Sequence, residues 1–339
     1  MSTEITPDLA VTPKEGMGPV RPVETTPSLA PGSRRRTSTV DVHWLEAPGL
    51  PGPRAVDARA RDVIGKRGDA LVLSALSLTM RLDRTAMIEE VEAHGIEGDV
   101  GALVGLRVGP GFRRKAAEAL PAERSNRSAA WTMIDDLATA MLVSNYARLR
   151  AGFQPPWVVS GEPPKADICS GWKMDGTFIQ ESVTLGRQLV TVGPIAPVLE
   201  LPEEPYGWHA IAQLPINGVR RRRRLDVSPG DPLLVDAMFR DTYALDSSTE
   251  QVIHEYALSA EIDPVTFDVL GAQADPRVLP YLECPAAAAS AERLGGLAIG
   301  GLREKVRAEF VGTSTCTHLN DLFRCLEDVL GLWGDGHPG

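Results

Sequence analysis

The sequence lacks the features that mark secreted and membrane proteins. Its 339 residues include only four cysteines, Cys169, Cys284, Cys316 and Cys325, which is too few for a disulfide framework. No apolar run is long enough to span a bilayer, and the N-terminal stretch lacks the basic-then-apolar order of a secretory signal. We therefore expect a cytoplasmic protein without a membrane partner, whose cysteines serve as thiols or as ligands.

Positive charge is also in short supply. The formal net charge is -10 at pH 7, so a nucleic acid held by phosphate neutralisation is not expected as a partner. The chain has no P-loop, no Gly-x-Gly-x-x-Gly after a strand, no Gly-x-Ser-x-Gly and no His-Glu-x-x-His. These absences argue against nucleotide-driven chemistry and against the standard hydrolase mechanisms.

The composition changes along the chain. Residues 1–33 are rich in Pro, Thr, Ser and Glu and have no apolar period, so we expect a disordered tail there and a flexible tail at 333–339. Residues 151–219 are rich in Pro and Gly, and their Asp175-Gly176 pair predicts a hairpin. An insertion of this kind usually covers or lines a pocket.

Between these segments, the same order of patterns occurs twice. Alternating apolar residues first predict strands at 39–44, 55–64, 71–82 and 87–93, followed by helices at 111–118 and 131–150. They then predict strands at 225–227, 233–245, 254–262 and 267–272, followed by helices at 285–294, 301–306 and 315–332. Gly111 aligns with Gly301, and Asp83 aligns with Asp263.

These matches predict an α+β protein made of two tandem, divergent copies of one unit, residues 34–150 and 220–332. Each copy is expected to be an antiparallel sheet of three or four strands covered by helices, and the copies form one pseudo-symmetric body with the insertion across their junction. The alternative is that two α+β halves share only a general pattern. The arginine runs at 34–36 and 220–224 are typical of solvated linkers, with anion binding as the alternative.

The two copies differ at positions that carry chemistry. Where the second copy has cysteine and histidine, the first has residues without that chemistry, and Cys284 has no titratable counterpart. This pattern is expected if the second copy keeps a site and the first keeps only the packing. The aligned pairs are Cys316 with Trp131, His318 with Met133, and His254 with Ser74.

The residues of this set suit a metal ion. Cys284, Cys316, His318 and His254 offer two thiolates and two imidazoles for the tetrahedral site that zinc favours, with His254 as fourth ligand or general base. A second interpretation makes Cys316 a nucleophile at a helix N-terminus, with His318 or His254 as its base. A third makes the whole set buried and structural. Asp167 is a further catalytic candidate if the insertion covers a pocket.

The same residues carry a resemblance. Residues 301–307 and the Cys-Thr-His-Leu of residues 316–319 resemble a bacterial family called domain of unknown function 2889, although Thr315 replaces the family's glycine. The resemblance covers residues 220–330 well and 34–150 in outline. It implies that His254 and Cys284 occupy the family's histidine and cysteine positions, and it implies no activity. The order of cysteine, small-residue helix, cysteine and histidine is also loosely similar to iron–sulfur assembly scaffolds.

The sequence thus predicts a metal-dependent enzyme, a hydrolase, lyase or decarboxylase, whose substrate is a small organic acid or acyl compound. Zinc or iron is the expected cofactor, and His254, Cys316 and Asp167 are the catalytic candidates. The alternative is a non-enzymatic metal-binding or interaction protein in which the cysteine–histidine set is structural.

Overall fold

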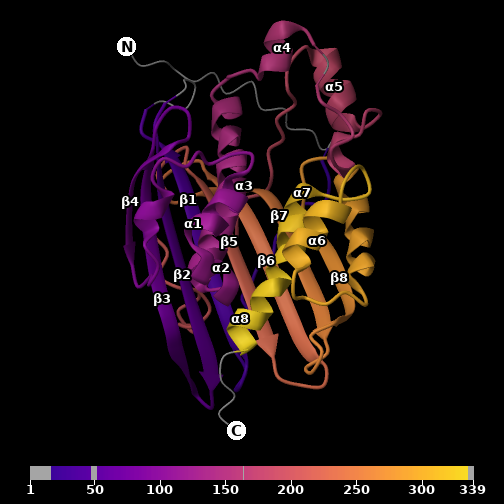
Figure 1. Cartoon of the computed structure of the whole chain (residues 1–339). Helices are drawn as coiled ribbons and strands as arrows, with labels where there is room; N and C mark the ends of the chain where they lie inside the picture. The colour runs from indigo at the N-terminus through magenta and orange to yellow at the C-terminus, as the bar shows by residue number, and fades with distance from the viewer. Residues whose placement is uncertain (1–16, 47–51, 163, 335–339) are drawn as a thin grey trace.

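The computed structural model describes residues 17–46, 52–162 and 164–334, so the outer parts of both predicted tails lie outside the described residues. Within these ranges, eight strands form one antiparallel sheet in the order β4-β3-β2-β1-β5-β6-β7-β8. Helices follow each set of four strands (Figure 1), which confirms the predicted α+β class.

The strands form where the sequence alternates between apolar and polar residues. In β2, buried and partly exposed side chains alternate along most of the strand, as expected when one face of a sheet is covered. The strands are β1 (Arg34–Trp44), β2 (Arg54–Lys66), β3 (Asp69–Leu82), β4 (Ile88–His94), β5 (Val219–Ser228), β6 (Leu233–Ala244), β7 (Glu250–Ile262) and β8 (Val269–Val278).

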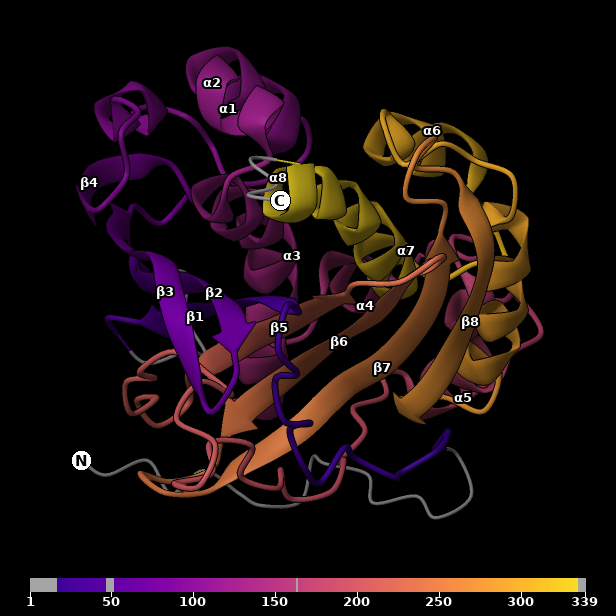
Figure 2. The same ribbon diagram turned by 90° about the horizontal axis from the view of Figure 1, so that it is seen from below.

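Most helices pack on one face of the sheet, which curves around α3, α7 and α8 (Figure 2). None of the helices in the described ranges is long and apolar enough to cross a membrane. The α-helices are α1 (Phe112–Ala119), α2 (Pro121–Asn126), α3 (Ala129–Arg150), α4 (Pro156–Ser160), α5 (Thr177–Leu185), α6 (Leu302–Glu309), α7 (Thr317–Arg324) and α8 (Asp328–Gly334). The 3-10 helices are η2 (Val100–Leu103), η3 (Ser170–Trp172), η4 (Cys284–Leu294) and η5 (Cys325–Glu327).

Strands β1 and β5 join the two halves at the centre of the sheet, and each half is a four-stranded meander. The halves share local irregularities. The register shifts after Asp62 between β2 and β3, and after Asp241 between β6 and β7. Gly111 and Gly301 each directly precede a helix, and their own backbone is left-handed, with φ at 82° and 81°. This conformation favours glycine.

Apart from the partly exposed Arg34, both arginine runs are buried in the central strands rather than solvated. The linker prediction for residues 34–36 and 220–224 is therefore wrong. The reason is that carboxylates from distant segments pair with these arginines and so offset the cost of burying their charges. Pairs with N···O distances between 2.6 and 2.9 Å include Arg35 with Asp226, Arg36 with Asp62, Arg220 with Asp41, Arg222 with Glu200, and Arg223 with Asp136, and Arg224 also pairs with Asp226 and Asp236.

The face of the sheet opposite the helices is crossed by residues 17–33 and by the last part of the insertion (Figure 2). Although residues 1–33 were expected to be a disordered tail, the part from Gly18 onward lies against the sheet. Backbone hydrogen bonds join Gly18 to Leu279 and Arg21 to Arg277. The composition of residues 1–33 could not predict this packing, because the packing depends on backbone hydrogen bonds at the edge of the sheet and not on apolar side chains.

The insertion holds no hairpin at Asp175-Gly176, contrary to the prediction. Gly176 is instead the residue that precedes α5. The carboxylate of Glu283 accepts hydrogen bonds from the backbone N–H and the hydroxyl of Thr177, at 2.8 and 2.7 Å. This distant acceptor satisfies the first turn of a helix, so the turn leads into α5 and not into a return strand.

Candidate functional site

A cavity of about 510 Å³ lies between α3, the insertion and the second half of the chain. Residues 153–156, 168–172 and 188–191 of the insertion form part of its wall, as the insertion's composition predicted. Five residues singled out in the sequence meet at this wall. They are His254, His318, Cys169, Cys284 and Cys316.

The strand register places His254 beside a buried carboxylate. His254 on β7 is the direct partner of Asp241 on β6, immediately before the bulge. Asp241 is fully buried, and its Oδ2 lies 3.5 Å from Nδ1 of His254. Side chains directly opposite each other in an antiparallel pair are close enough to interact in this way.

The first turn of α7 brings a second imidazole to the same point. The helix begins at Thr317, directly after Cys316, so His318 lies in its first turn. The rings of His254 and His318 stack with their centroids 4.0 Å apart. Asp241, His254 and His318 each offer one ligand atom, and these atoms lie within 4.8 Å of one another. This spacing fits a metal-binding group.

The polar atoms of this group lack hydrogen-bond partners among the described residues. Both carboxylate oxygens of Asp241, Nδ1 of His254 and Nε2 of His318 are buried and unpartnered. Such atoms are uncommon, and each costs roughly 1–3 kcal/mol. Burial, with His254 and Arg221 nearby, lowers the pKa of His318 well below its usual value. Its imidazole is therefore neutral, which is the form that binds metals.

The first half contains the same arginine–aspartate pair in a closed form. Arg36 and Asp62 are cross-strand partners there, as Arg221 and Asp241 are in the second half. Arg36 donates hydrogen bonds of 2.8 and 2.7 Å to Asp62. Arg221 instead lies 3.6 Å from Asp241 and reaches Asp321 at 3.4 Å. The second half thus keeps the pair but opens it beside the two histidines.

The cysteines of the cavity wall lie apart from this compact group. Among the described residues, the group whose ligand atoms lie within 4.8 Å of one another consists of Asp241, His254 and His318 and does not include Cys284 or Cys316. Burial, followed by the influence of Cys169, raises the pKa of Cys316 to about 12, and burial raises that of Cys284 well above its usual value. The helix N-terminus does not offset this desolvation. In the metal-free protein the environment therefore disfavours the thiolate-nucleophile interpretation.

Slow alkylation is the expected behaviour of these thiols. At pH 7.5, iodoacetamide should modify Cys316 at least about 100-fold more slowly than a cysteine in an unfolded peptide, because the thiolate is rare and the sulfur is buried. Peptide mass spectrometry after timed labelling measures the two rates. Fast labelling of Cys316 in the folded protein would restore the nucleophile interpretation.

Asp167 is not among the described residues that line the cavity. Its Oδ1 accepts a hydrogen bond from the backbone N–H of Met174 at 3.0 Å, and its own N–H donates to the carbonyl of Trp172. Its backbone is left-handed, with φ at 59°. Its carboxylate therefore closes a turn ahead of α5, away from His254 and His318.

Sequence reasoning missed Asp241. The residue lies beside Arg240 in the otherwise apolar middle of β6, and adjacent charges in a buried strand are a signal of a site or of an ion pair. Glu255 accounts for Arg240, since the two side chains form a buried ion pair. That pairing leaves Asp241 as the residue to explain, but only the strand register shows that it faces His254.

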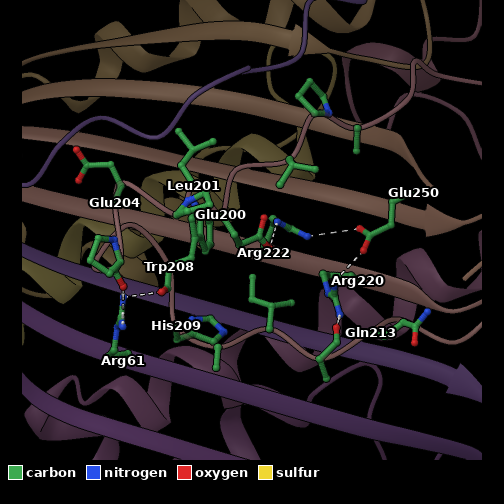
Figure 3. A pocket seen from close by; sticks show the side chains of 18 of the residues that line it. Arg61, Glu200, Leu201, Glu204, Trp208, His209, Gln213, Arg220, Arg222 and Glu250 are labelled. Atoms are coloured by element: carbon green, nitrogen blue, oxygen red, sulfur yellow. Dashed lines mark hydrogen bonds and ion pairs between the residues drawn. The ribbon is translucent and has the colours of Figure 1, made fainter. Parts of the chain in front are cut away.

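A second cavity, of about 770 Å³, lies on the opposite face of the sheet (Figure 3). Its charged side chains pair with one another, as in the contacts of Arg220 with Glu250 at 2.7 Å and Arg222 with Glu200 at 2.9 Å. His209 in its wall hydrogen-bonds through both ring nitrogens to threonine hydroxyls. Burial and nearby arginines lower the pKa of His209 to about 3. These groups satisfy each other, so this cavity is the weaker candidate.

Comparison with known proteins agrees with the resemblance carried by the Cys-Thr-His-Leu motif. No curated protein and no solved structure matches the chain. The likeness to iron–sulfur assembly scaffolds stays a prediction. The family described as "Protein of unknown function (DUF2889)" matches residues 219–331, which run from β5 into the last helices. The half of the chain that carries Asp241, His254 and His318 is therefore the half that resembles this family.

Proposed function

We propose that the protein is a metal-dependent enzyme, a hydrolase, lyase or decarboxylase, that acts on a small organic acid or acyl compound. One observation carries the proposal. Asp241, His254 and His318 offer polar atoms without hydrogen-bond partners that lie within 4.8 Å of one another, and the two histidines line a cavity large enough for a small molecule.

The donor set of this group indicates which metals fit. Two imidazoles and one carboxylate bind zinc in several catalytic sites, and the same set binds iron(II). With three protein ligands, either ion would have positions left for substrate or water, and it would polarise a carbonyl group or make a bound water more acidic. This composition replaces the two cysteine ligands expected from the sequence with Asp241 and retains His254 and His318.

The chain's own residues supply the surroundings for such chemistry. The insertion lines part of the cavity with apolar groups, which lower the local dielectric constant and so strengthen electrostatic interactions inside. The hydroxyl of Tyr256 donates a hydrogen bond of 3.2 Å to the carbonyl of Cys284, which fixes the wall next to Cys316. In this proposal the cysteines shape the cavity, and the histidines and Asp241 hold the metal.

Metal-dependent turnover tests the proposal. Protein stripped with a chelator and reloaded with Zn²⁺ or Fe²⁺ would be incubated with 2-hydroxy acids, β-keto acids, esters and thioesters, and the products followed by nuclear magnetic resonance. We expect conversion of at least one class by reloaded protein only. His254→Ala should abolish this conversion and leave the melting temperature within a few degrees of the wild type.

The rival function predicts a different result for the same variant. If the metal or the histidine pair is structural, His254→Ala should lower the melting temperature clearly, and reloading should restore stability without conversion of any compound. That outcome would favour a non-enzymatic metal-binding or interaction protein and overturn the enzyme proposal.

We also propose that the two halves are divergent copies of one unit. The matched bulges after Asp62 and Asp241, and the matched left-handed glycines before α1 and α6, support this origin. Asp83 and Asp263 support it too, because each accepts backbone hydrogen bonds in the turn between the third and fourth strands of its half. A cytoplasmic location is part of the proposal, since the cysteines are free thiols.

A further inference from the structure

The charge of the cavity wall is unbalanced. Among the described residues that line it there is no aspartate or glutamate, and Arg148 is the one lysine or arginine. Most of the remaining wall is apolar or aromatic, with Phe153, Trp172 and Tyr281 among its rings. A largely apolar wall with a single permanent cation favours an organic anion with an apolar body.

No described residue supplies the half-buried Arg148 with a carboxylate, whereas most of the buried arginines of this protein have one. Its guanidinium lies over the rings of Phe153 and Trp44, with distances of 3.5 and 5.6 Å to the ring centroids. Its Nε is buried without a hydrogen-bond partner in the described part of the chain. Burial lowers the pKa of Arg148, and the charged neighbour that interacts with it is another cation, Arg54, which also lies over Trp44. By contrast, Arg36 and Arg223 each donate two hydrogen bonds to one carboxylate.

We propose that the substrate is an apolar carboxylic acid whose carboxylate pairs with Arg148 while its reacting end faces His254 and His318. The reacting end rests on the metal-dependent function proposed above, whereas the carboxylate end rests on Arg148 alone. A guanidinium matches a carboxylate through two parallel hydrogen bonds. Contact with Phe153 holds the guanidinium plane in place before the ligand arrives, which reduces the entropy lost on binding.

Binding of a matched pair of probes tests this inference. Isothermal titration calorimetry would compare 3-phenylpropanoate with the neutral 3-phenylpropanamide, using wild-type protein with and without Zn²⁺. We expect the acid to bind about 10- to 100-fold more tightly than the amide, the factor that one charge-assisted hydrogen-bonded pair supplies. Arg148→Met should erase this preference, and Arg148→Lys should retain part of it.

The controls separate this inference from the proposed function. Arg114→Met removes an exposed arginine that pairs with Glu118, and it should leave the preference unchanged. A preference that survives Arg148→Met but disappears in His254→Ala would place the carboxylate at the metal, which would overturn the inference and support the metal site. Equal binding of acid and amide, or binding of neither at millimolar concentration, would also overturn it. If the wild type does not bind Zn²⁺ but still prefers the acid over the amide in an Arg148-dependent way, only the metal proposal is refuted.

Discussion

Replacing Asp135 by asparagine should lower the free energy of unfolding by about 3–5 kcal/mol at neutral pH. Asp135 on α3 is buried and faces arginines of both halves, with Arg113 at 3.1 Å, Arg324 at 3.6 Å and Arg303 at 3.8 Å. Without the carboxylate charge of Asp135, the positive charges of these three guanidiniums are only partly neutralised by other acidic residues. Urea-induced unfolding followed by circular dichroism measures the difference.

The effect of Asp135→Asn should depend on pH in a defined direction. Burial acts to raise the pKa of Asp135, but Arg113, Arg324 and Arg303 outweigh burial and hold the pKa well below its usual range. A carboxyl group of this kind stabilises the fold above its unfolded pKa of about 3.9 and loses that contribution as pH falls through the folded value. The difference from wild type should therefore be complete above about pH 5 and shrink only below about pH 4.

An exposed ion pair provides the matched control. Glu118 pairs with Arg114 at 2.8 Å on the surface of α1, and pairs of this kind contribute about 0–1 kcal/mol. Glu118→Gln should therefore change stability little. If Asp135→Asn costs no more than Glu118→Gln, the claim that buried ion pairs join the two halves is contradicted.

The second large effect is expected on metal affinity. Asp241→Asn should weaken Zn²⁺ binding by at least about 100-fold, because it removes the anionic member of the group and indirect partners alone contribute about 10- to 100-fold. Competition with a chromophoric chelator measures the affinity. The melting temperature of the metal-free variant, compared with that of metal-free wild type, shows whether folding is retained.

Asp62→Asn is the control for this experiment, since Asp62 holds the matching place in the first half. Its carboxylate is fully used by Arg36, so the variant should lose stability while Zn²⁺ affinity stays within about 3-fold of wild type. Equal losses of affinity in Asp62→Asn and Asp241→Asn would show that the metal does not bind at Asp241.

Local patterns were sufficient to predict most strands and the α+β class. The predicted bounds of β3 and β6 lie within about two residues of those in the structure, and in the second half of β3 the side chains alternate between buried and exposed as a half-buried strand requires. The strand at 225–227 was predicted too short, since its first part is the arginine run of β5. The five consecutive arginines hide the strand pattern of that segment, because charged residues are rarely buried. Its carboxylate partners, Asp136 and Asp41 among them, come from elements far away in the chain.

The candidate site was predictable only in part, because some of its members come together only through long-range strand pairing. Comparison of the two halves of the sequence predicts His254 and His318 as site residues, and the structure places their rings in stacked contact. Asp241 was missed because its importance depends on the pairing of β6 with β7 and on the way Arg221 turns toward Asp321. Burial bears on the nucleophile interpretation as well, since desolvation keeps the thiol of Cys316 protonated in the metal-free protein.

Elemental analysis of protein purified without a metal-affinity tag tests the central claim most directly. The wild type would be compared with a His254→Ala/His318→Ala variant and a Cys284→Ser/Cys316→Ser variant, each checked for folding by circular dichroism. The proposed site predicts near-stoichiometric zinc or iron in the wild type and in the cysteine variant, and none in the histidine variant. Metal lost from the cysteine variant but kept in the histidine variant, or absent from all three even after reloading, would contradict it.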